Sequence, residues 1–282
     1  MAERHGLPAA PLRRERLGTN VVFAAGGEHL VKLFPPLWAA EQGVERAALG
    51  HVAGRLSVAT PEVVAEGALE GWSYLVLTRV PGTPLEELWP RLAPEARARA
   101  ARRSGEIVAE HHALALPGAG VPAPPWPAFV ADRAEQARAR LAASPRTRAW
   151  AEALPAFLAP ILPSLGSAPR VFLNGDVTEE HLLVAPDGSG EVIGLVDLAD
   201  AMVGAREYDL VSFAVFLGPH APLLREFLGG ARVPASERGP ALALRLAAWA
   251  LLHRYANGDA LAAAAGDGVT LAGLPAALFG AL

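Results

Sequence analysis

The sequence predicts an α+β fold of two lobes, a small β-rich N-terminal lobe and a larger, mainly helical C-terminal lobe. Residues 1–80 are rich in runs of β-branched and aromatic residues, whereas residues 81–282 mostly follow a helical spacing of apolar positions. A length of 282 residues is also typical of about two domains or lobes. We therefore expect two lobes that divide near residue 80.

Four β-rich runs and one helical run make up the predicted N-terminal lobe. Gly26-Gly27 favours a turn between the first two runs, and Pro35-Pro36 ends the second. In chain order, the runs occupy residues 21–25, 29–34, 37–56 (the helical run), 61–67 and 72–80. The motif Pro81-Gly82-Thr83-Pro84 then stiffens and redirects the chain, so we expect it to link the lobes.

Helical runs dominate the predicted C-terminal lobe, and one β-rich segment interrupts them. Pro94 suits the first turn of a helix, and a proline-rich loop separates that helix from the next. In chain order, the helical runs occupy about residues 94–112, 129–143, 147–162 and 241–256. The β-rich segment at residues 171–200 contains Asp187-Gly188, which indicates a hairpin turn.

Composition excludes several classes of function. The 25 basic and 29 acidic residues give a net charge of −4, which argues against binding nucleic acid mainly through phosphate contacts. The absence of cysteine excludes disulfides, thiolate nucleophiles and cysteine-ligated zinc. No segment has the pattern of a secretory signal or a membrane-spanning helix. We therefore expect a cytoplasmic monomer or homodimer with no nucleic-acid or membrane partner.

Lys32 is the only lysine among the 25 basic residues, and the others are all arginine. In a strand it shares one face with Leu30 and Phe34, so we expect its ammonium to be at least half buried and to need a partner. Glu45 lies on the apolar face of the following helical run and needs a cation for the same reason. The pair Lys32–Glu45 satisfies both groups. The alternative is an ordinary surface lysine, but a single lysine indicates a site that a guanidinium does not serve.

A short turn-forming segment, Leu17-Gly18-Thr19-Asn20, precedes the first clear strand. Backbone amides in such a loop can contact phosphate oxygens, although the pattern also fits an ordinary turn. The sequence has no GxxxxGK[ST] motif, and no GxGxxG motif follows a strand. The P-loop and the dinucleotide-binding fold therefore lack their motifs.

Acidic residues follow two apolar runs within residues 171–200. Asp176 comes after the first run, and Asp197 comes directly after the second, with Asp200 three residues later. Paired carboxylates suit a divalent metal together with a base that orients a hydroxyl group. Aspartates also cap turns, which is the alternative for Asp176 and Asp200. His181 lies five residues after Asp176, just before another apolar run.

Together these residues resemble the aminoglycoside phosphotransferase family. The resemblance rests on Lys32, on Glu45, and on two motifs, NGDVTEEHLLV at residues 174–184 and GLVDLADAMVGAREYDLV at residues 194–211. It covers nearly the whole chain, from about residue 17 to residue 255. It implies a bilobal protein-kinase-like fold and an ATP-dependent enzyme that phosphorylates a hydroxyl group of a small molecule.

The resemblance also implies a role for each candidate site residue. Lys32 would contact the α- and β-phosphates of ATP, and Glu45 would hold it in place. Asp176 would be the catalytic aspartate that accepts or orients the proton of the acceptor hydroxyl, and Asp197 would bind Mg²⁺. The remaining implied roles are phosphate contact by the loop residues Gly18, Thr19 and Asn20, adenine contact by the hinge residues Thr78 and Val80, and a structural role for Asp209.

Two positions depart from the pattern of the family. Asn174 stands where the family usually has His, and its amide can support the loop in a similar way. His181 stands where the family usually has an Asn metal ligand, and imidazole suits Mg²⁺ less well than an amide oxygen. Either one metal site is therefore weakened, with reduced or lost activity as one consequence, or Glu180 or Asp200 compensates, or Mn²⁺ is preferred. His181 itself is either a metal ligand or an ordinary packed histidine.

Three functions remain open on these residues. The leading one is a kinase that phosphorylates a small-molecule hydroxyl, with an aminoglycoside-like antibiotic as one candidate acceptor. The second is a nucleotide-binding pseudokinase or interaction module of the same fold, for which Asn174 and His181 argue. The third is a hydrolase that uses the same acids with a metal.

Overall fold

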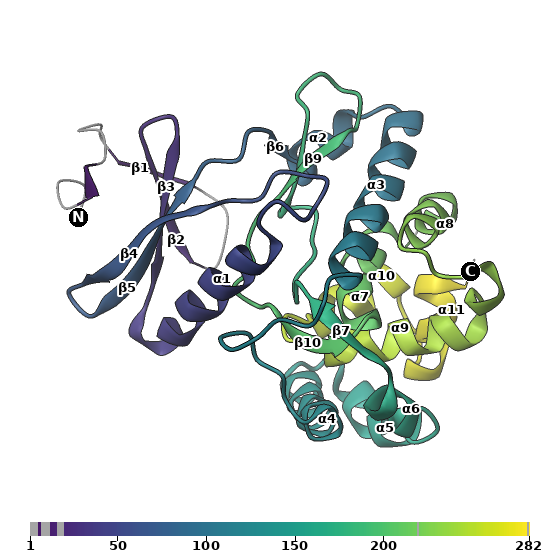
Figure 1. Ribbon diagram of the computed structural model, residues 1–282. Helices are drawn as coiled ribbons and strands as arrows, with labels where there is room; N and C mark the ends of the chain where they lie inside the picture. Colours follow the sequence, from purple (N-terminus) through teal and green to yellow (C-terminus); the bar gives the residue numbers. More distant parts are fainter. Residues whose placement is uncertain (1–4, 7–11, 16–19, 219, 281) are drawn as a thin grey trace. The chain divides into compact units, whose positions relative to one another are not determined.

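The computed structural model describes residues 5–6, 12–15, 20–218, 220–280 and 282 (Figure 1). It contains both helices and strands, so the predicted α+β class is confirmed. The chain forms two compact units that alternate along the sequence. The first contains residues up to 96 together with 116–122 and 174–202, and the second contains residues 97–115, 123–173 and 203–282. A lobe boundary near residue 80 stays a prediction.

In the described part of the chain, five antiparallel strands form the main sheet of the first unit (Figure 1). Their order is β1-β2-β3-β5-β4. They span Arg13–Arg14 (β1), Val21–Ala25 (β2), His29–Phe34 (β3), Val63–Leu69 (β4) and Trp72–Thr78 (β5). The bounds of β2 and β3 are those predicted. Gly26 between them has a φ of +70°, which glycine adopts without a steric penalty.

The register of this sheet places Lys32 among apolar side chains on one face. Lys32 is paired with Val22 on β2 and with Leu75 on β5, and Leu30 is paired with Leu77. Cross-strand partners project to the same face of a sheet, so these five side chains share a face. The other face contributes a buried cluster formed by Ala25, Val31, Tyr74 and Val76.

Helix α1 (Ala39–Val52) packs against the sheet and carries Glu45. Its buried residues are Glu45, Ala48, Leu49 and Val52. The helix is shorter than the predicted run of residues 37–56, because a 3-10 turn precedes it and the backbone leaves the helical conformation at Ala53. Gly54 follows with a φ of +65°, a conformation that commonly ends helices.

A smaller sheet of the first unit contains the predicted hairpin. Strands β8 (Leu182–Val184) and β9 (Val192–Leu195) pair antiparallel, and β6 (Thr83–Pro84) pairs with β8. The predicted turn at Asp187-Gly188 is confirmed, because the Asp187 carboxylate accepts a hydrogen bond from the N–H of Ser189 and Gly188 has a φ of +77°. The predicted linker at residues 81–84 therefore contributes a short strand to this sheet.

The hairpin is held against the end of the main sheet by a close backbone approach. A Cβ atom at Gly194 would lie 2.6 Å from Cγ1 of Val80, so only glycine fits there. The N–H of Ala59 donates to the carbonyl of Ile193, and the N–H of Leu195 donates to the carbonyl of Ala59. These contacts bring the segment that follows β9 next to Lys32.

Most of the second unit is helical, and β7 (Arg170–Leu173) and β10 (Met202–Ala205) form a two-stranded sheet in it. The longer helices are α3 (Pro94–His112), α4 (Trp126–Ala143), α5 (Arg148–Leu158), α6 (Leu162–Ser167), α7 (Glu207–Leu217), α8 (Ala221–Gly230), α9 (Pro240–Leu252), α10 (Gly258–Ala265) and α11 (Leu274–Phe279). The predicted run at residues 147–162 divides into α5 and α6, and the predicted run at 241–256 ends at Leu252. The short helix α2 (Leu85–Leu88) follows β6 in the first unit.

The described ranges of the chain hold no helix of the length and apolarity that crossing a membrane requires.

Helices α3 and α8 contact each other backbone to backbone in the second unit. A Cβ atom at Gly105 would lie 2.6 Å from the backbone nitrogen of Ala231, and one at Gly230 would lie 2.9 Å from the backbone nitrogen of Glu106. Neither position can hold a larger residue unless a helix moves. The two glycines therefore set the close packing of α3 on α8.

Asp209 has the structural environment that the resemblance implied. Its side chain is 1% exposed on α7, and its Oδ2 lies 2.8 Å from Nε2 of His112 on α3. The histidine N–H donates to the carboxylate and joins the two helices. A buried carboxylate without this donor would retain the full cost of desolvation.

Replacing His112 with alanine is expected to cost about 1.5–3 kcal/mol of unfolding free energy, the usual worth of a hydrogen bond to a charged group. Urea denaturation followed by circular dichroism measures it. Asp267→Ala is the matched control, because the Asp267 carboxylate is fully exposed and its pair with Arg146 contributes little. Equal stability losses in the two variants would contradict the structural role of the His112–Asp209 bond.

Candidate active site

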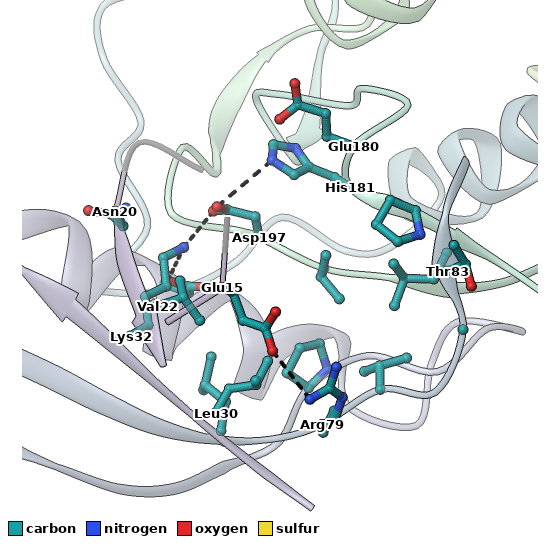
Figure 2. Close-up of a pocket in the computed structure, with 18 of the residues that line it drawn as sticks. Glu15, Asn20, Val22, Leu30, Lys32, Arg79, Thr83, Glu180, His181 and Asp197 are labelled. Atoms are coloured by element: carbon teal, nitrogen blue, oxygen red, sulfur yellow. Dashed lines mark hydrogen bonds and ion pairs between the residues drawn. The ribbon is translucent and has the colours of Figure 1, made fainter. Parts of the chain in front are cut away.

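Lys32 lies between two carboxylates at the centre of the site (Figure 2). Its Nζ is 2.8 Å from Oε2 of Glu45 and 2.8 Å from Oδ1 of Asp197, and its side chain is only 4% exposed. The predicted Lys32–Glu45 pair is confirmed. The second partner, Asp197, was missed, because no local pattern indicates a contact between residues 165 positions apart.

Electrostatics fixes the charges of this group. Burial lowers the pKa of Lys32, but Asp197 and Glu45 outweigh that effect, so the pKa is raised and the ammonium stays charged. Burial alone would raise the pKa of Asp197, but Lys32 and His181 hold it well below its usual range. Burial raises the pKa of Glu45, and Lys32 offsets this only in part. Of the two carboxyl groups beside Lys32, Asp197 is therefore the one that is firmly ionised.

The backbone of Asp197 is held in an unusual conformation directly after β9. Its φ is +61°, a left-handed conformation that costs a non-glycine residue on the order of 1–3 kcal/mol and that occurs often at functional sites. The N–H of Ala199 donates to its Oδ1, and Nδ2 of Asn174 donates to its carbonyl at 3.1 Å. The surrounding structure thus maintains the strained conformation.

Residues 174–181 form a loop that internal hydrogen bonds fix. Asn174 is 1% exposed, and its Oδ1 accepts from the N–H of Asp176 at 3.0 Å. The amide of Asn174 therefore joins Asp176 to Asp197, which confirms the supporting role expected of it. Nδ1 of His181 lies 2.7 Å from the carbonyl of Asp176 and 3.1 Å from Oγ1 of Thr178. Since a carbonyl can only accept, Nδ1 carries the hydrogen.

Asp176 lies in an environment that favours its protonated form. Burial raises the pKa of its carboxyl to about 7, His181 counteracts this in part, and the carboxylates of Asp200, Asp197 and Glu180 raise it further. Its Oδ2 is 3.7 Å from Nδ1 of His181. The carboxyl of Asp176 can therefore take up and release a proton close to neutral pH.

His181 faces Asp197 with its second ring nitrogen. Nε2 lies 3.9 Å from Oδ2 of Asp197, the carboxylate oxygen that Lys32 does not contact (Figure 2). Burial lowers the pKa of His181, but Asp197 and Asp176 outweigh it, so the pKa is raised. The imidazole is thus both anchored and directed at a carboxylate, which a purely packed histidine does not require.

Asp197 and His181 offer one carboxylate oxygen and one imidazole nitrogen to a cation. No group of three or more His, Asp and Glu side chains suited to a metal ion occurs among the residues that the structure describes. A cation that arrives with a nucleotide needs only one or two protein ligands, since phosphate oxygens and water supply the others. The residues present fit a nucleotide-bound divalent ion.

A cavity of about 810 Å³ in the first unit contains Lys32 and Asp197 in its wall. Apolar side chains supply much of the remaining wall, and Figure 2 shows two of them, Val22 and Leu30, close to Lys32. The apolar lining residues are Val22, Leu30, Pro61, Leu77, Val80, Pro84, Leu183 and Val196. Such a cavity has the size of a small-molecule site and combines an apolar wall with a few charged groups.

The structure brings most of the predicted site residues to this cavity. Lining residues that the sequence predicted are Asn20, Lys32, Glu45, Val80, His181 and Asp197. Asp176 contacts the cavity residue His181, as described above. Thr78 is not among the described lining residues; its hydroxyl accepts from the N–H of Glu62, and its N–H donates to the carbonyl of Glu62. Gly18 and Thr19 lie outside the described residues, so their roles stay predictions.

Sequence reasoning missed a second ion pair in the cavity wall. Nη1 of Arg79, just after β5, lies 3.4 Å from Oε1 of Glu15, just after β1 (Figure 2). The same Glu15 oxygen is 3.2 Å from Arg13. Both partners belong to segments without a distinctive pattern, so no sequence signal indicates the pair.

The chain is similar to known proteins both in sequence and in structure. Residues 13–264 match the model of the family described as "Phosphotransferase enzyme family" (APH). No curated protein matches the sequence. Similar solved structures are the GDP complex of wild-type aminoglycoside 2'-phosphotransferase-IIIa (18% identity, 98% of this chain and 90% of that chain, TM-score 0.71) and the streptomycin–ATP complex of APH(2")-IIa (14%, 88% and 86%, 0.66). A third is the apoenzyme of macrolide 2'-phosphotransferase MphH from Brachybacterium faecium (24%, 98% and 96%, 0.58). At these identities the likeness establishes the fold, and it confirms the kinase-like fold that the sequence predicts.

Proposed function

Because the chain belongs to the phosphotransferase enzyme family and is therefore a kinase, we propose that it transfers the γ-phosphoryl group of ATP to a hydroxyl group of a small molecule. The observation that carries this proposal is the position of Lys32. It is held by Glu45 and Asp197 in the wall of a cavity, with the Asp176 loop hydrogen-bonded to the same Asp197. Phosphoryl transfer needs chiefly this kind of positioning and charge stabilisation.

The cavity supports the binding of a nucleotide. Its apolar side chains, among them Leu30, Leu77 and Val80, suit the faces of a purine, and Lys32 supplies a fixed positive charge for the α- and β-phosphates. Asn20 also lines the cavity, and the preceding Gly18 and Thr19 are proposed to contact the phosphates through their backbone amides. For the hinge, Val80 is in a suitable position, and Thr78 would contribute through its backbone carbonyl.

Asp176 is the proposed base of the reaction. The acceptor hydroxyl would donate its proton to the Asp176 carboxylate while the hydroxyl oxygen forms a bond to the γ-phosphorus. The bond between that phosphorus and the bridging oxygen of ADP breaks, and its electrons stay on ADP. Asn174 and His181 hold the Asp176 backbone on either side, so the carboxylate keeps one position during transfer.

Asp197 and His181 are the proposed protein ligands of the divalent cation, Mg²⁺ or Mn²⁺. When bound, the cation would offset the charge that develops on the phosphates during transfer. Asp197 is suited to this because Lys32 occupies only Oδ1 and the carboxylate remains ionised. The strained backbone at Asp197 keeps Oδ2 toward His181.

An aminoglycoside-like antibiotic is the proposed acceptor class. It is supported by relatives of the same fold whose structures hold streptomycin or kanamycin. Acidic groups of the first unit also support this acceptor class. Burial raises the pKa of Glu179, and repulsion from the carboxylates of the adjacent Glu180 and of Glu86 raises it further. A polycationic acceptor would relieve this repulsion. We propose that the protein phosphorylates such an antibiotic in the cytoplasm. If phosphorylation inactivates the antibiotic, the protein is a resistance enzyme.

A catalytically inactive nucleotide-binding protein of the same fold is the second candidate. The observation that favours it is His181, whose Nδ1 is bound to the Asp176 carbonyl and which supplies nitrogen where Mg²⁺ prefers oxygen. It predicts nucleotide binding without turnover.

The test combines thermal shift with a coupled assay for ADP formation. The purified protein is mixed with ATP, with Mg²⁺ or Mn²⁺, and with aminoglycosides, hygromycin-type compounds, macrolides, sugars, amino alcohols and amino acids, each alone and in combination. The kinase proposal expects stabilisation by nucleotide and acceptor-dependent ADP formation with one chemical class. Stabilisation by ATP without turnover of any acceptor under either metal would favour the inactive protein.

A further inference from the structure

We infer that the cation position between Asp197 and His181 prefers a first-row transition-metal ion such as Mn²⁺ to Mg²⁺. The inference rests on the proposed function, which places nucleotide phosphates beside Asp197. It concerns the identity of the ion, which neither the family nor the solved relatives assign to this chain.

The first step is the orientation of the imidazole. Nδ1 of His181 is 2.7 Å from the carbonyl of Asp176, so Nδ1 carries the hydrogen, and once the other nitrogen gives up its proton as a metal ion binds, the free lone pair is on Nε2. Thr178 lies beside the same Nδ1 at 3.1 Å. The hydrogen bond at Nδ1 therefore fixes the orientation of the ring. A metal-binding histidine is usually oriented in this way, by a hydrogen bond to the ring nitrogen that does not bind the metal.

The second step is the position of the two free ligand atoms. Lys32 takes Oδ1 of Asp197, and Oδ2 faces Nε2 of His181 at 3.9 Å. Metal bonds of about 2.1 Å from each atom can bridge this separation. The side chains of His181 and Asp197 are 14% and 26% exposed, so the position is partly shielded but accessible from the cavity.

The third step is the chemistry of the donor pair. Mg²⁺ is a hard ion that prefers oxygen ligands and retains its water, whereas imidazole nitrogen suits transition-metal ions. For a site with a nitrogen ligand, affinity rises from Mn²⁺ to Co²⁺ along the Irving–Williams order. Of the two protein ligands here, one is nitrogen, so His181 shifts the preference away from Mg²⁺.

Metal binding tests this without turnover. Titration of Mn²⁺ into the protein with a non-hydrolysable ATP analogue, followed by the EPR signal of free Mn²⁺, gives the Mn²⁺ affinity, and competition gives those of Mg²⁺ and Co²⁺. The wild type is expected to bind Mn²⁺ about tenfold more tightly than Mg²⁺, and Co²⁺ more tightly still. Equal affinities for Mg²⁺ and Mn²⁺ would overturn the inference.

Three variants separate ligation from packing. In His181→Asn the amide nitrogen can keep the bond to the Asp176 carbonyl while the amide oxygen replaces the imidazole nitrogen. Most of the roughly tenfold preference for Mn²⁺ over Mg²⁺ is therefore expected to be lost. His181→Leu fills the space without a ligand and is expected to weaken both ions. His220→Asn, at an exposed histidine of the second unit, is the matched control. An unchanged metal preference in His181→Asn would sink the inference.

The metal affinities are measured without an acceptor, so they do not depend on which acceptor the protein uses. A His181-dependent Mn²⁺ preference in a protein that turns over no acceptor keeps the inference and removes the proposed function. Acceptor turnover together with a metal preference that His181→Asn leaves unchanged keeps the proposed function and removes the inference. If His181→Asn fails to fold, His181→Leu decides, because loss of the imidazole nitrogen must weaken the binding of Mn²⁺ more than that of Mg²⁺.

Discussion

Asp176→Asn is expected to lower kcat by about 10²–10⁴-fold, the usual contribution of a positioned general base, with little change in nucleotide affinity. The amide is nearly isosteric with the carboxylate but cannot take up the acceptor proton. The backbone bonds that hold residue 176, from Asn174 and to His181, do not involve its side chain and are retained. The loss should therefore appear in kcat and not in nucleotide binding.

Coupled assays for ADP formation and calorimetric titration of an ATP analogue measure the two quantities separately. Glu180→Gln is the matched control, because it also removes a carboxylate near Asp176, from a residue in the cavity wall that takes no part in the proposed proton transfer. We expect it to retain most of the turnover. Full phosphoryl transfer by Asp176→Asn would remove Asp176 from the mechanism.

Lys32→Arg is expected to reduce kcat/KM by on the order of 10²-fold although it conserves the charge. Nζ of Lys32 lies 2.8 Å from both Glu45 and Asp197, and the side chain is only 4% exposed. A guanidinium is longer and planar, and its fork would engage one carboxylate at the expense of the other. The Asp197 carboxylate would then move relative to the phosphates.

The same position tests the buried charges through stability. Lys32→Met leaves the Glu45 and Asp197 carboxylates without their cation and is expected to cost about 3–5 kcal/mol in urea denaturation. Adding Glu45→Gln removes one uncompensated charge, so the double variant should recover part of that loss. Wild-type kcat/KM in Lys32→Arg would show that the single lysine reflects composition and not the site.

The Gly175 backbone gives a further expected result within the same loop. Gly175 has a φ of +89°, and a Cβ atom there would lie 2.7 Å from the carbonyl carbon of Asp200. Gly175→Ala should cost about 1–3 kcal/mol of stability from the clash in addition to the strain of a left-handed alanine. Gly188→Ala isolates the strain alone, because Gly188 has a φ of +77° with nothing within 4 Å. A comparable melting temperature in both variants would contradict the clash.

Local patterns were sufficient to predict several elements of the fold. Strands β2 and β3 have the predicted bounds because β-branched runs flank a glycine pair, and the hairpin turn at Asp187-Gly188 has the usual chemistry of such a turn. The Lys32–Glu45 pair was also predictable, because each charged residue lies on an apolar face where it needs a counter-ion.

Long-range pairing explains what the sequence did not predict. Asp197 reaches Lys32 from the end of β9, where Gly194 packs against Val80 in an approach that no local pattern indicates. Strand β1 has two arginines and no apolar alternation, so only its pairing with β2 makes it a strand. In the same way, the linker at residues 81–84 forms β6 because β8 lies beside it.

The single lysine makes the site directly readable by amine chemistry. The printed sequence has no other side-chain amine, so any acylated side-chain amine is Lys32. In the folded protein the ammonium is buried, charged and held by two carboxylates, so acylating reagents should modify it slowly. A reagent that carries an acyl phosphate on a nucleotide would deliver its acyl group to Lys32 from within the cavity. Mass spectrometry of one peptide would then report nucleotide occupancy in the unaltered protein.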